Sequence, residues 1–230
     1  MELAILNDIA KCTACRACQV ACKNWNRLSA DKTENRGSHE NPPDLSENTW
    51  NRIVFMETRM SGGRIDWTFF NDRCRHCEDA PCMAAAEESV PGAIIRDGSG
   101  AIVFTDKTAQ LDYDSILAEC PYDIPRKNEE TGRIHKCTMC IDRITNGLKP
   151  ACVTACSTGA LQFGPKQDML KLAHDRIRIL GKNANLYPGE EYNTLWILPE
   201  SQDSYSIAHN HRSRPYRIAV MAPKPMRMAG

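Results

Sequence analysis

Short runs of hydrophobic and polar residues predict two pairs of β-strands in the first half of the chain. Residues 51–59 and 64–70 are rich in β-branched and aromatic side chains and flank a Ser-Gly-Gly turn, which predicts one strand pair. Residues 93–96 and 101–105 are short apolar runs separated by Asp-Gly-Ser-Gly, which predicts a hairpin. The first pair leads directly into a group of cysteines that begins at Cys74.

A helix is predicted near the end of the chain and a polar loop near its beginning. Apolar residues recur at helical spacing between positions 165 and 180, and Gly181 is a typical stop signal, so we expect a helix that serves packing. The residues at this spacing are Met169, Leu172, Ala173, Ile177 and Leu180. Residues 30–45 are polar and contain a glycine and two prolines, so we expect a surface loop there.

The composition is that of a globular chain. Of its 230 residues, 42% are hydrophobic, which is enough to bury a core. Lys plus Arg and Asp plus Glu both number 29, so the charge gives no indication of a nucleic-acid partner. The first residues lack the basic and apolar regions of a signal peptide, and no apolar stretch reaches the roughly 18 residues of a spanning helix. We therefore expect neither an export signal nor a membrane span in this chain.

Twelve cysteines are the strongest chemical signal. An even number raises the alternative of a disulfide framework, but such frameworks belong to shorter secreted chains with more evenly spaced cysteines. The cysteines here form four groups: Cys12, Cys15, Cys18 and Cys22; Cys74, Cys77 and Cys82; Cys120 alone; and Cys137, Cys140, Cys152 and Cys156. Such bunching indicates metal binding.

The first group has the spacing C-x2-C-x2-C-x3-C, which is typical of bacterial ferredoxins that bind 4Fe-4S clusters. Three closely spaced cysteines on a tight loop reach one cluster, whereas the fourth, on the following helical turn, points to a neighbouring cluster. A zinc site usually takes two separated C-x2-C pairs and leaves half of this run unexplained. The last group alone also fits a zinc ribbon, and its iron-sulfur interpretation depends on the first group.

In two-cluster ferredoxins the fourth cysteine of each run ligates the other cluster, so the first and last groups are expected to exchange ligands. The same rule, applied to the middle groups, completes a third set. The predicted sets are quartet 1 (Cys12, Cys15, Cys18 and Cys156), quartet 2 (Cys137, Cys140, Cys152 and Cys22) and quartet 3 (Cys74, Cys77, Cys82 and Cys120). This pairing uses all twelve cysteines and predicts three 4Fe-4S clusters.

Aligning the groups on their C-x3-C or Cys-Pro steps reveals four degenerate copies of one repeat. Four complete runs would need cysteines at four further positions, which hold Ala86, Gln110, Tyr113 and Ile116. All four positions belong to one cluster, so a fourth cluster is missing without leaving any ligand unpaired. A zinc or disulfide arrangement does not predict such a grouped loss.

Basic and aromatic side chains lie close to the cysteines in sequence. The basic neighbours are Lys11, Arg16, Lys23, Arg73, Arg75 and Lys136. Anionic clusters favour nearby cations, so these residues are expected either to tune cluster potentials or to be ordinary surface charges. We interpret His76 and His135 as neighbours of the ligands and not as ligands. Trp25, Trp50 and Trp67 are expected in the core or at a subunit interface. No side chain is a convincing catalytic nucleophile or base.

The cysteine motifs resemble those of the iron-sulfur beta subunits of molybdenum or tungsten bis-pterin oxidoreductases. The motifs are CTACRACQVAC, CRHCEDAPC, ECPYDIPR and KCTMCIDRITNGLKPACVTAC, and they cover residues 12–156. Within that superfamily the chain is most similar to the soluble three-cluster formate dehydrogenase beta subunits, through the sequences GSHENPPDL, RIDWTFF and CPYDIPR. One departure is Ser157, which stands where the family usually has a proline after the last cysteine.

The resemblance implies an α+β fold of two pseudo-symmetric bacterial-ferredoxin-like halves, with loop insertions and a C-terminal helix and tail. Residues 1–30 with 130–165 are expected to form the half that binds two clusters. Residues 68–129 are expected to form the half with one cluster and a vacant second site. Residues 31–67 are expected to be an insertion that contacts another subunit, and residues 166–230 the C-terminal helix and a basic tail.

The resemblance also implies a large catalytic partner subunit with a bis-pterin molybdenum or tungsten site, where formate is oxidised to CO2. This chain would carry the electrons and would have no active site or cofactor other than its three 4Fe-4S clusters. The alternatives are the same role for an oxyanion or sulfur-compound reductase, a free-standing polyferredoxin and a zinc-organised interaction module.

The vacant site and the expected lack of a spanning tail together favour a soluble acceptor, such as a cytochrome c, that docks near quartet 3. In this scheme electrons arrive at quartet 1, pass quartet 2 and leave from quartet 3, while Arg73 and Arg75 steer the acceptor. The resemblance suggests a periplasmic heterodimer, exported with the signal of its partner, and a cytoplasmic location is the alternative.

Overall fold

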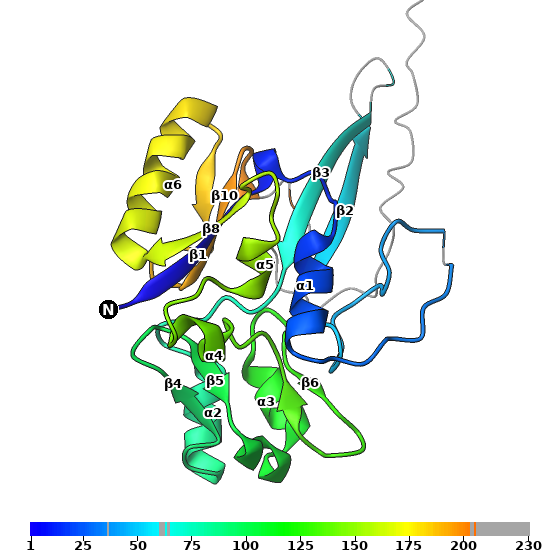
Figure 1. Cartoon of the computed structure of the whole chain (residues 1–230), viewed down its shortest axis with the longest axis vertical. Helices are drawn as coiled ribbons and strands as arrows, with labels where there is room; N and C mark the ends of the chain where they lie inside the picture. The colour runs from blue at the N-terminus through cyan, green and yellow to red at the C-terminus, as the bar shows by residue number, and fades with distance from the viewer. Residues whose placement is uncertain (36, 60–62, 64, 203–204, 206–230) are drawn as a thin grey trace, which may run out of the picture.

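The structure is a computed structural model that describes residues 1–35, 37–59, 63, 65–202 and 205. Within these residues the chain forms short helices and four small β-sheets (Figure 1). The mixture of α and β elements agrees with the predicted α+β class.

The largest sheet in the described part of the chain joins residues from both of its ends. The strand order is β8-β1-β10-β9. β1 pairs in parallel with β10 and antiparallel with β8, and β9 pairs antiparallel with β10. The strands span Leu3–Asp8 (β1), Leu161–Pro165 (β8), Asn185–Tyr187 (β9) and Thr194–Leu198 (β10). β1 ends four residues before Cys12, so this sheet fixes the position at which the first cysteine group begins.

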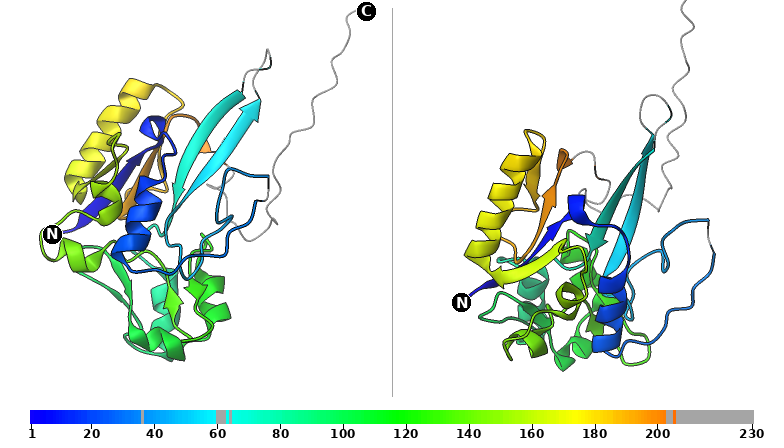
Figure 2. Two further views of the ribbon diagram at one scale, coloured as in Figure 1. Left: turned by 45° about the vertical axis from the view of Figure 1, so that its right-hand side comes forward. Right: turned by 45° about the horizontal axis from the view of Figure 1, so that its top comes forward.

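The predicted helix is α6 (Lys166–Leu180), which covers one face of this sheet (Figures 1 and 2). Ala173 is fully buried against β1 and β10. Gly181 ends the helix with a φ of 110°, a conformation that favours glycine. The predicted apolar stripe was wrong at Leu172, which is 42% exposed, because the buried face runs through Leu170 instead.

The first predicted strand pair is confirmed. β2 (Arg52–Arg59) and β3 (Ile65–Asp72) pair antiparallel and rise away from the rest of the described chain (Figure 2). At the base of this hairpin Phe70 stacks on Trp196 of β10, with ring centroids 5.3 Å apart. The indole N–H of Trp196 donates to the carbonyl oxygen of Asn71 at 3.0 Å, so the hairpin is fixed to the largest sheet. The predicted Ser-Gly-Gly turn lies largely outside the described residues.

The second predicted hairpin is also confirmed. β4 (Ile94–Arg96) pairs antiparallel with β5 (Ile102–Phe104). The hairpin packs with α2 (Pro81–Ser89) and α3 (Tyr113–Glu119) around one hydrophobic core. This core forms the lower part of the molecule in Figure 1.

Three of the four positions that would need cysteines for a fourth cluster pack in this same core. Ala86 and Ile116 are buried in it, and Tyr113 is half-buried against it. Gln110 is exposed at the end of η3 (Asp106–Gln110). Three of the four positions therefore meet as apolar or aromatic side chains, and the polar one points to solvent.

Near the cysteines, α1 (Ala17–Trp25) and the short α5 (Ala151–Thr154) pack against each other (Figure 1). The other elements are η1 (Ile9–Lys11), α4 (Ile141–Ile144) and the paired strands β6 (Arg126–Lys127) and β7 (Ile134–His135). The predicted basic tail lies outside the described residues. Within the described part, no helix combines the length and apolar character needed to cross a membrane.

Candidate metal centres

Each predicted cysteine quartet lines one cavity. Quartet 1 lines the first cavity together with Ile53 and Phe69. Quartet 2 lines the second with Ile5 and Met139, and quartet 3 lines the third with Pro81. The crossed arrangement of the first and last groups is therefore present in the fold, although the sulfurs come from segments far apart in sequence. Across the described residues, no three His, Cys, Asp or Glu side chains gather closely enough to hold a single metal ion.

The three cavities follow one another in the order of their quartets. Cys18 of quartet 1 and Cys152 of quartet 2 lie in one core cluster. Cys137 of quartet 2 and Cys74 of quartet 3 lie in another. Besides burial, the Cys152 thiolate raises the pKa of Cys18, and the Cys74 thiolate raises the pKa of Cys137. Both effects reflect how close the paired sulfurs lie. A path through the interior thus joins quartet 1 to quartet 3 by way of quartet 2.

Left-handed turns recur beside the ligands. Ala14, His76 and Met139 each stand two residues after the first cysteine of their run and have φ values of 54°, 50° and 56°. Non-glycine residues rarely adopt such values, so these turns persist only where the surroundings fix them. The N–H groups of His76 and Met139 donate to the sulfurs of Cys74 and Cys137, each at 3.4 Å. The sequence analysis did not predict these left-handed turns. Their one sequence signal is the C-x2-C spacing, because each turn lies between the two cysteines of such a pair.

Burial makes the free thiols weak acids. It raises the pKa of Cys18 to about 12 and that of Cys137 to about 11, although the Arg73 guanidinium opposes both shifts. Burial also raises the pKa of Cys82 to about 12, and Lys136 opposes this shift. The thiolate is the form that binds metal, so positive charge nearby favours the ligand form of these residues.

Three of the basic neighbours supply that charge from inside the protein. Arg73 and Arg75 are fully buried and Lys136 is nearly so. The prediction that Arg73 and Arg75 steer an acceptor was therefore wrong, because a guanidinium without solvent contact cannot attract a partner from outside. Their burial results from packing between distant segments.

The other three basic neighbours lie nearer the surface. The side chain of Lys11 is 42% exposed. Arg16 lies over the ring of Phe55, 5.0 Å from its centroid. The Nζ of Lys23 pairs with Asp31 at 2.6 Å, which ties α1 to the following loop.

The two histidines lie beside the quartets and are not among the side chains that line the three cavities. His76 is fully buried, and its Nδ1 accepts the N–H of Ile102 at 3.0 Å. Burial lowers its pKa well below the usual value, and Lys136 acts in the same direction, so the ring is neutral. His135 is half-buried and stacks on Trp50, with centroids 5.8 Å apart.

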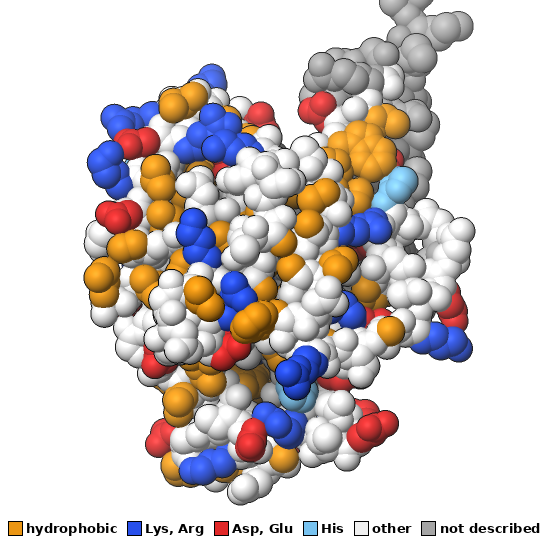
Figure 3. Space-filling model, in the orientation of Figure 1, with side chains coloured by type: hydrophobic (Ala, Val, Ile, Leu, Met, Phe, Trp, Pro, Cys, Tyr) orange, Lys and Arg blue, Asp and Glu red, His pale blue; other side chains and the backbone are white. Residues whose placement is uncertain are grey.

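An aromatic group covers one side of the β2–β3 hairpin beside quartet 1. Figure 3 shows hydrophobic side chains next to a histidine at the upper right, where this hairpin lies. The group consists of His39, Phe55, Trp67 and Phe69. Trp67 is 43% exposed, whereas Phe69 lines the first cavity. Trp25 is also exposed, and the buried tryptophan of the core is Trp196.

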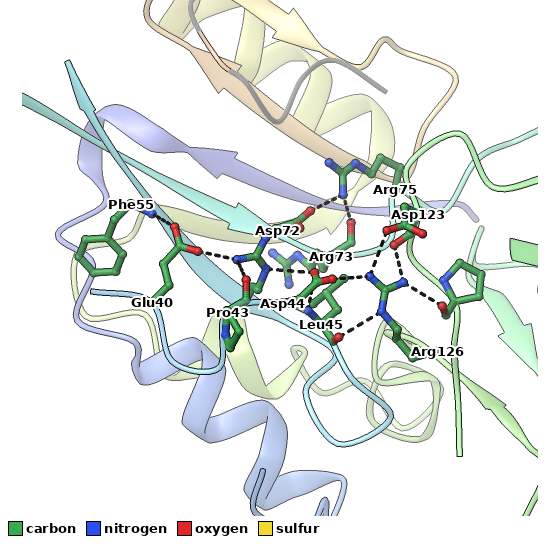
Figure 4. Close-up of polar contacts among 12 residues, drawn as sticks. Glu40, Pro43, Asp44, Leu45, Phe55, Asp72, Arg73, Arg75, Asp123 and Arg126 are labelled. Carbon is green, nitrogen blue, oxygen red and sulfur yellow. Dashed lines mark hydrogen bonds and ion pairs between the residues drawn. The ribbon is translucent and has the colours of Figure 1, made fainter. Parts of the chain in front are cut away.

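A buried row of alternating charges runs from the loop before β2 to Arg75 (Figure 4). Glu40 accepts the N–H of Phe55 at 2.8 Å and pairs with Arg52 at 2.8 Å. Arg52 also lies 3.6 Å from Asp72, and Asp72 pairs with Arg75 at 2.7 Å. Arg75 in turn lines the third cavity. The loop is exposed along most of its length, as predicted, but this row anchors it in the interior.

Replacing Arg52 by Met is expected to destabilise the protein by about 3–5 kcal/mol, because it removes the buried cation that Glu40 and Asp72 share. The measurement is the urea midpoint of unfolding, followed by circular dichroism. Arg178→Met is the control: its side chain is 77% exposed, so its ion pair should contribute no more than about 1 kcal/mol. Equal shifts in the two variants would contradict the buried role of Arg52.

Comparison with known proteins identifies the family. A family model described as a 4Fe-4S dicluster domain matches residues 65–166. The formate dehydrogenase subunit beta of Megalodesulfovibrio gigas is 46% identical over 209 residues, which cover 87% of this chain and 97% of that protein. The formate dehydrogenase 2 subunit beta (cytochrome c-553) of Nitratidesulfovibrio vulgaris is 42% identical over 212 residues, which cover 89% of this chain and 97% of that protein.

A more distant relative is the thiosulfate reductase electron transfer subunit of Salmonella typhi. It is 34% identical over 164 residues, which cover 71% of this chain and 76% of that protein. Identity and coverage are both higher for the two formate dehydrogenase subunits, so the resemblance found in the motifs is confirmed. The chain belongs to the family of formate dehydrogenase beta subunits, the iron-sulfur electron-transfer subunits of these oxidoreductase complexes.

Proposed function

We propose that this chain carries electrons through three 4Fe-4S clusters, held by quartets 1, 2 and 3, between a catalytic subunit and an external acceptor. The catalytic partner would hold a molybdenum or tungsten bis-pterin site and oxidise formate to CO2. The observation that carries the proposal is the series of three cavities, each lined by four cysteines and adjacent to the next.

The donor set suits iron-sulfur clusters, because four cysteines line each cavity. Among the described residues, no carboxylate or imidazole lines the second or the third cavity, and Asp8 is the one carboxylate residue at the first. When bound, a 4Fe-4S cluster takes up and releases one electron at a time. The matched dicluster region contains eight cysteines: Cys74, Cys77, Cys82, Cys120, Cys137, Cys140, Cys152 and Cys156. The four cysteines of the first group lie outside it and line the first and second cavities, which supports a third cluster.

The proposal includes two pseudo-symmetric ferredoxin-like halves. The first comprises residues 1–30 with 130–165, and the second comprises residues 68–129. Two features support this duplication. α1 packs on α5 in the first half as α2 packs on α3 in the second. The left-handed turn two residues after the first cysteine recurs in both halves.

Quartet 1 is proposed to face the catalytic subunit. Cys15 of this quartet is exposed. The aromatic group of the β2–β3 hairpin lies beside the same cavity, and exposed aromatic side chains are enriched where proteins associate. The insertion of residues 31–67 would then form part of the subunit contact.

Quartet 3 is proposed as the place where electrons leave. Charged side chains that adjoin its ligands in sequence and are exposed are acidic, namely Glu78, Asp79 and Glu119. Such a rim suits a basic soluble acceptor. The name of the Nitratidesulfovibrio vulgaris relative includes cytochrome c-553, and a cytochrome c is accordingly the acceptor proposed for this chain.

The substrate and the location are also proposals. The thiosulfate reductase relative supports a sulfur-compound reductase as the second candidate complex. The family resemblance supports a periplasmic heterodimer that is exported with its partner. Fractionation of cells that express the chain with and without its large subunit tests the location, and arrival in the periplasm without the partner would contradict joint export.

The intact complex provides the test of function. We expect about twelve iron and about twelve acid-labile sulfide per chain, as three cubane clusters require. Formate is expected to reduce the clusters, as seen by electron paramagnetic resonance, with quartet 1 before quartet 3 in rapidly frozen samples. Stoichiometric zinc, or about sixteen iron, would overturn the cluster assignment. Reduction by a sulfur compound and not by formate would favour the second candidate.

A further inference from the structure

Arg73 and Lys136 occupy equivalent places in the repeat. Each stands immediately before the first cysteine of a C-x2-C pair, Arg73 before Cys74 of quartet 3 and Lys136 before Cys137 of quartet 2. Both side chains are buried. A buried charge is costly unless an anion compensates it, yet among the residues that the structure describes neither cation forms an ion pair with a carboxylate. Arg73 contacts a cysteine sulfur, and Lys136 lines a cavity with four cysteines, so thiolates are the anions that these two cations face.

Arg73 contacts quartet 2 and not the quartet of its own sequence neighbour. Its Nη1 donates to the Sγ of Cys152 at 3.0 Å, and its Nη2 donates to the Oδ1 of Asn7 at 2.8 Å. The two contacts hold the guanidinium against the second set of sulfurs. The positive charge of Arg73 also acts to lower the pKa of the Cys18 and Cys137 thiols, so Arg73 lies where quartets 1 and 2 meet.

Lys136 shows the opposite arrangement: it precedes a cysteine of quartet 2 in sequence but lines the cavity of quartet 3. Its Nζ donates to the carbonyl oxygens of Ile102 at 2.6 Å and Cys137 at 3.0 Å, and it lies 4.7 Å from the ring centroid of Phe104. These contacts fix the ammonium group in the wall of the third cavity. Burial raises the pKa of Cys82 in that cavity, and the Lys136 charge opposes the rise. Each cation therefore acts on the cluster next to the one that its neighbouring cysteine would bind.

We propose that Arg73 raises the reduction potential of the quartet 2 cluster and that Lys136 raises that of the quartet 3 cluster. The inference rests on the proposed function, because both clusters must be bound. Reduction adds a negative charge to a cluster, and a fixed cation beside its ligands stabilises the reduced form. Lys11, the equivalent residue before Cys12, is 42% exposed and lies 3.8 Å from a carboxylate oxygen of Asp8, so solvent and that carboxylate screen its charge. A fixed cation therefore stabilises the reduced form at quartets 2 and 3, which follow the proposed entry point at quartet 1.

Potentiometric titration of the intact complex, followed by electron paramagnetic resonance, tests this assignment. In Arg73→Gln the equilibrium constant for one-electron reduction of the quartet 2 cluster is expected to fall at least tenfold, which corresponds to about 59 mV. The quartet 3 potential should not change. Lys136→Met should lower the quartet 3 potential by a similar amount. Lys11→Met is the matched control and should leave all three potentials unchanged.

Charge-preserving variants separate a purely structural role from control of potential. Arg73→Lys and Lys136→Arg are expected to keep most of the wild-type potential, whereas a packing defect would lower iron content without moving the potentials of the remaining clusters. Unchanged potentials in iron-replete Arg73→Gln, or a shift at quartet 3 instead of quartet 2, would overturn the proposal. If Arg73→Gln does not retain iron, Lys136→Met decides by the same criterion. A wild-type protein without three clusters would count against the proposed function itself.

Discussion

Replacing Cys22 by Ser is expected to perturb the cluster of quartet 2 and to leave that of quartet 1 intact. In sequence, Cys22 completes the run that supplies three ligands of quartet 1. In the fold Cys22 is buried and lines the second cavity with three cysteines of the last group, Cys137, Cys140 and Cys152. Cys18, one turn earlier on α1, lines the first cavity. The helix thus presents its two cysteines to different spaces.

The measurement is iron content together with the electron paramagnetic resonance spectrum of the reduced protein. Cys22→Ser should lose or alter one cluster signal, with a loss of up to about four iron per chain. Cys15→Ser is the matched control, because Cys15 belongs to the same run but lines the first cavity. Loss of the same signal in both variants would show that the run binds a single cluster and that the crossed pairing is wrong.

The sequence grouped the cysteines into the same sets that line the three cavities, because much of the spacing signal is local. The C-x2-C spacing determines which sulfurs can reach one centre, and the ferredoxin rule supplies the exchange between runs. The strand pairs were equally visible. β2 and β3 carry β-branched and aromatic residues on both sides of a turn, and the predicted ranges agree with Arg52–Arg59 and Ile65–Asp72.

The largest sheet was not visible in the sequence because its strands are short and pair across the whole described chain. All five residues of β10, Thr194–Leu198, are buried, so this strand shows no alternation of polar and apolar positions. β1 pairs with it in parallel, with Ile5 opposite Thr194. No local signal links segments so far apart in sequence, and the packing of α6 on both strands accompanies their pairing.

The burial of the cations at the candidate site was also not visible in the sequence, because it depends on segments far apart in the chain. Arg73 and Arg75 stand in a polar stretch that reads as exposed, and sequence reasoning therefore placed them on a docking surface. Their burial depends on partners from other segments, since Asn7 on β1 and Cys152 on α5 accept from Arg73. Arg75 is enclosed by aromatic rings, among them Tyr122 at 4.8 Å and Trp196 at 5.0 Å. None of these contacts is encoded in the neighbouring sequence.

Removal of the iron is expected to abolish the cooperative unfolding transition of the chain. Without clusters, the thiols take up protons, because burial raises the pKa of Cys18 and of Cys82 to about 12. Arg73 and Lys136 then remain as buried cations beside neutral sulfurs. An uncompensated buried charge costs about 3–5 kcal/mol, and two of them approach the 5–15 kcal/mol that stabilises a typical folded protein.

Thermal unfolding followed by circular dichroism, before and after reductive chelation, measures this effect. Chelator without reductant serves as the control for the chelator itself. The core between α6 and β1 contains no cysteine, so its amides provide an internal reference in hydrogen exchange. Acid should accelerate iron loss, because the ligands bind as thiolates and protons compete with iron below the thiol pKa. A cooperative transition that survives complete removal of iron would mean that the hydrophobic clusters hold the fold unaided, and that the buried cations find compensation without thiolates.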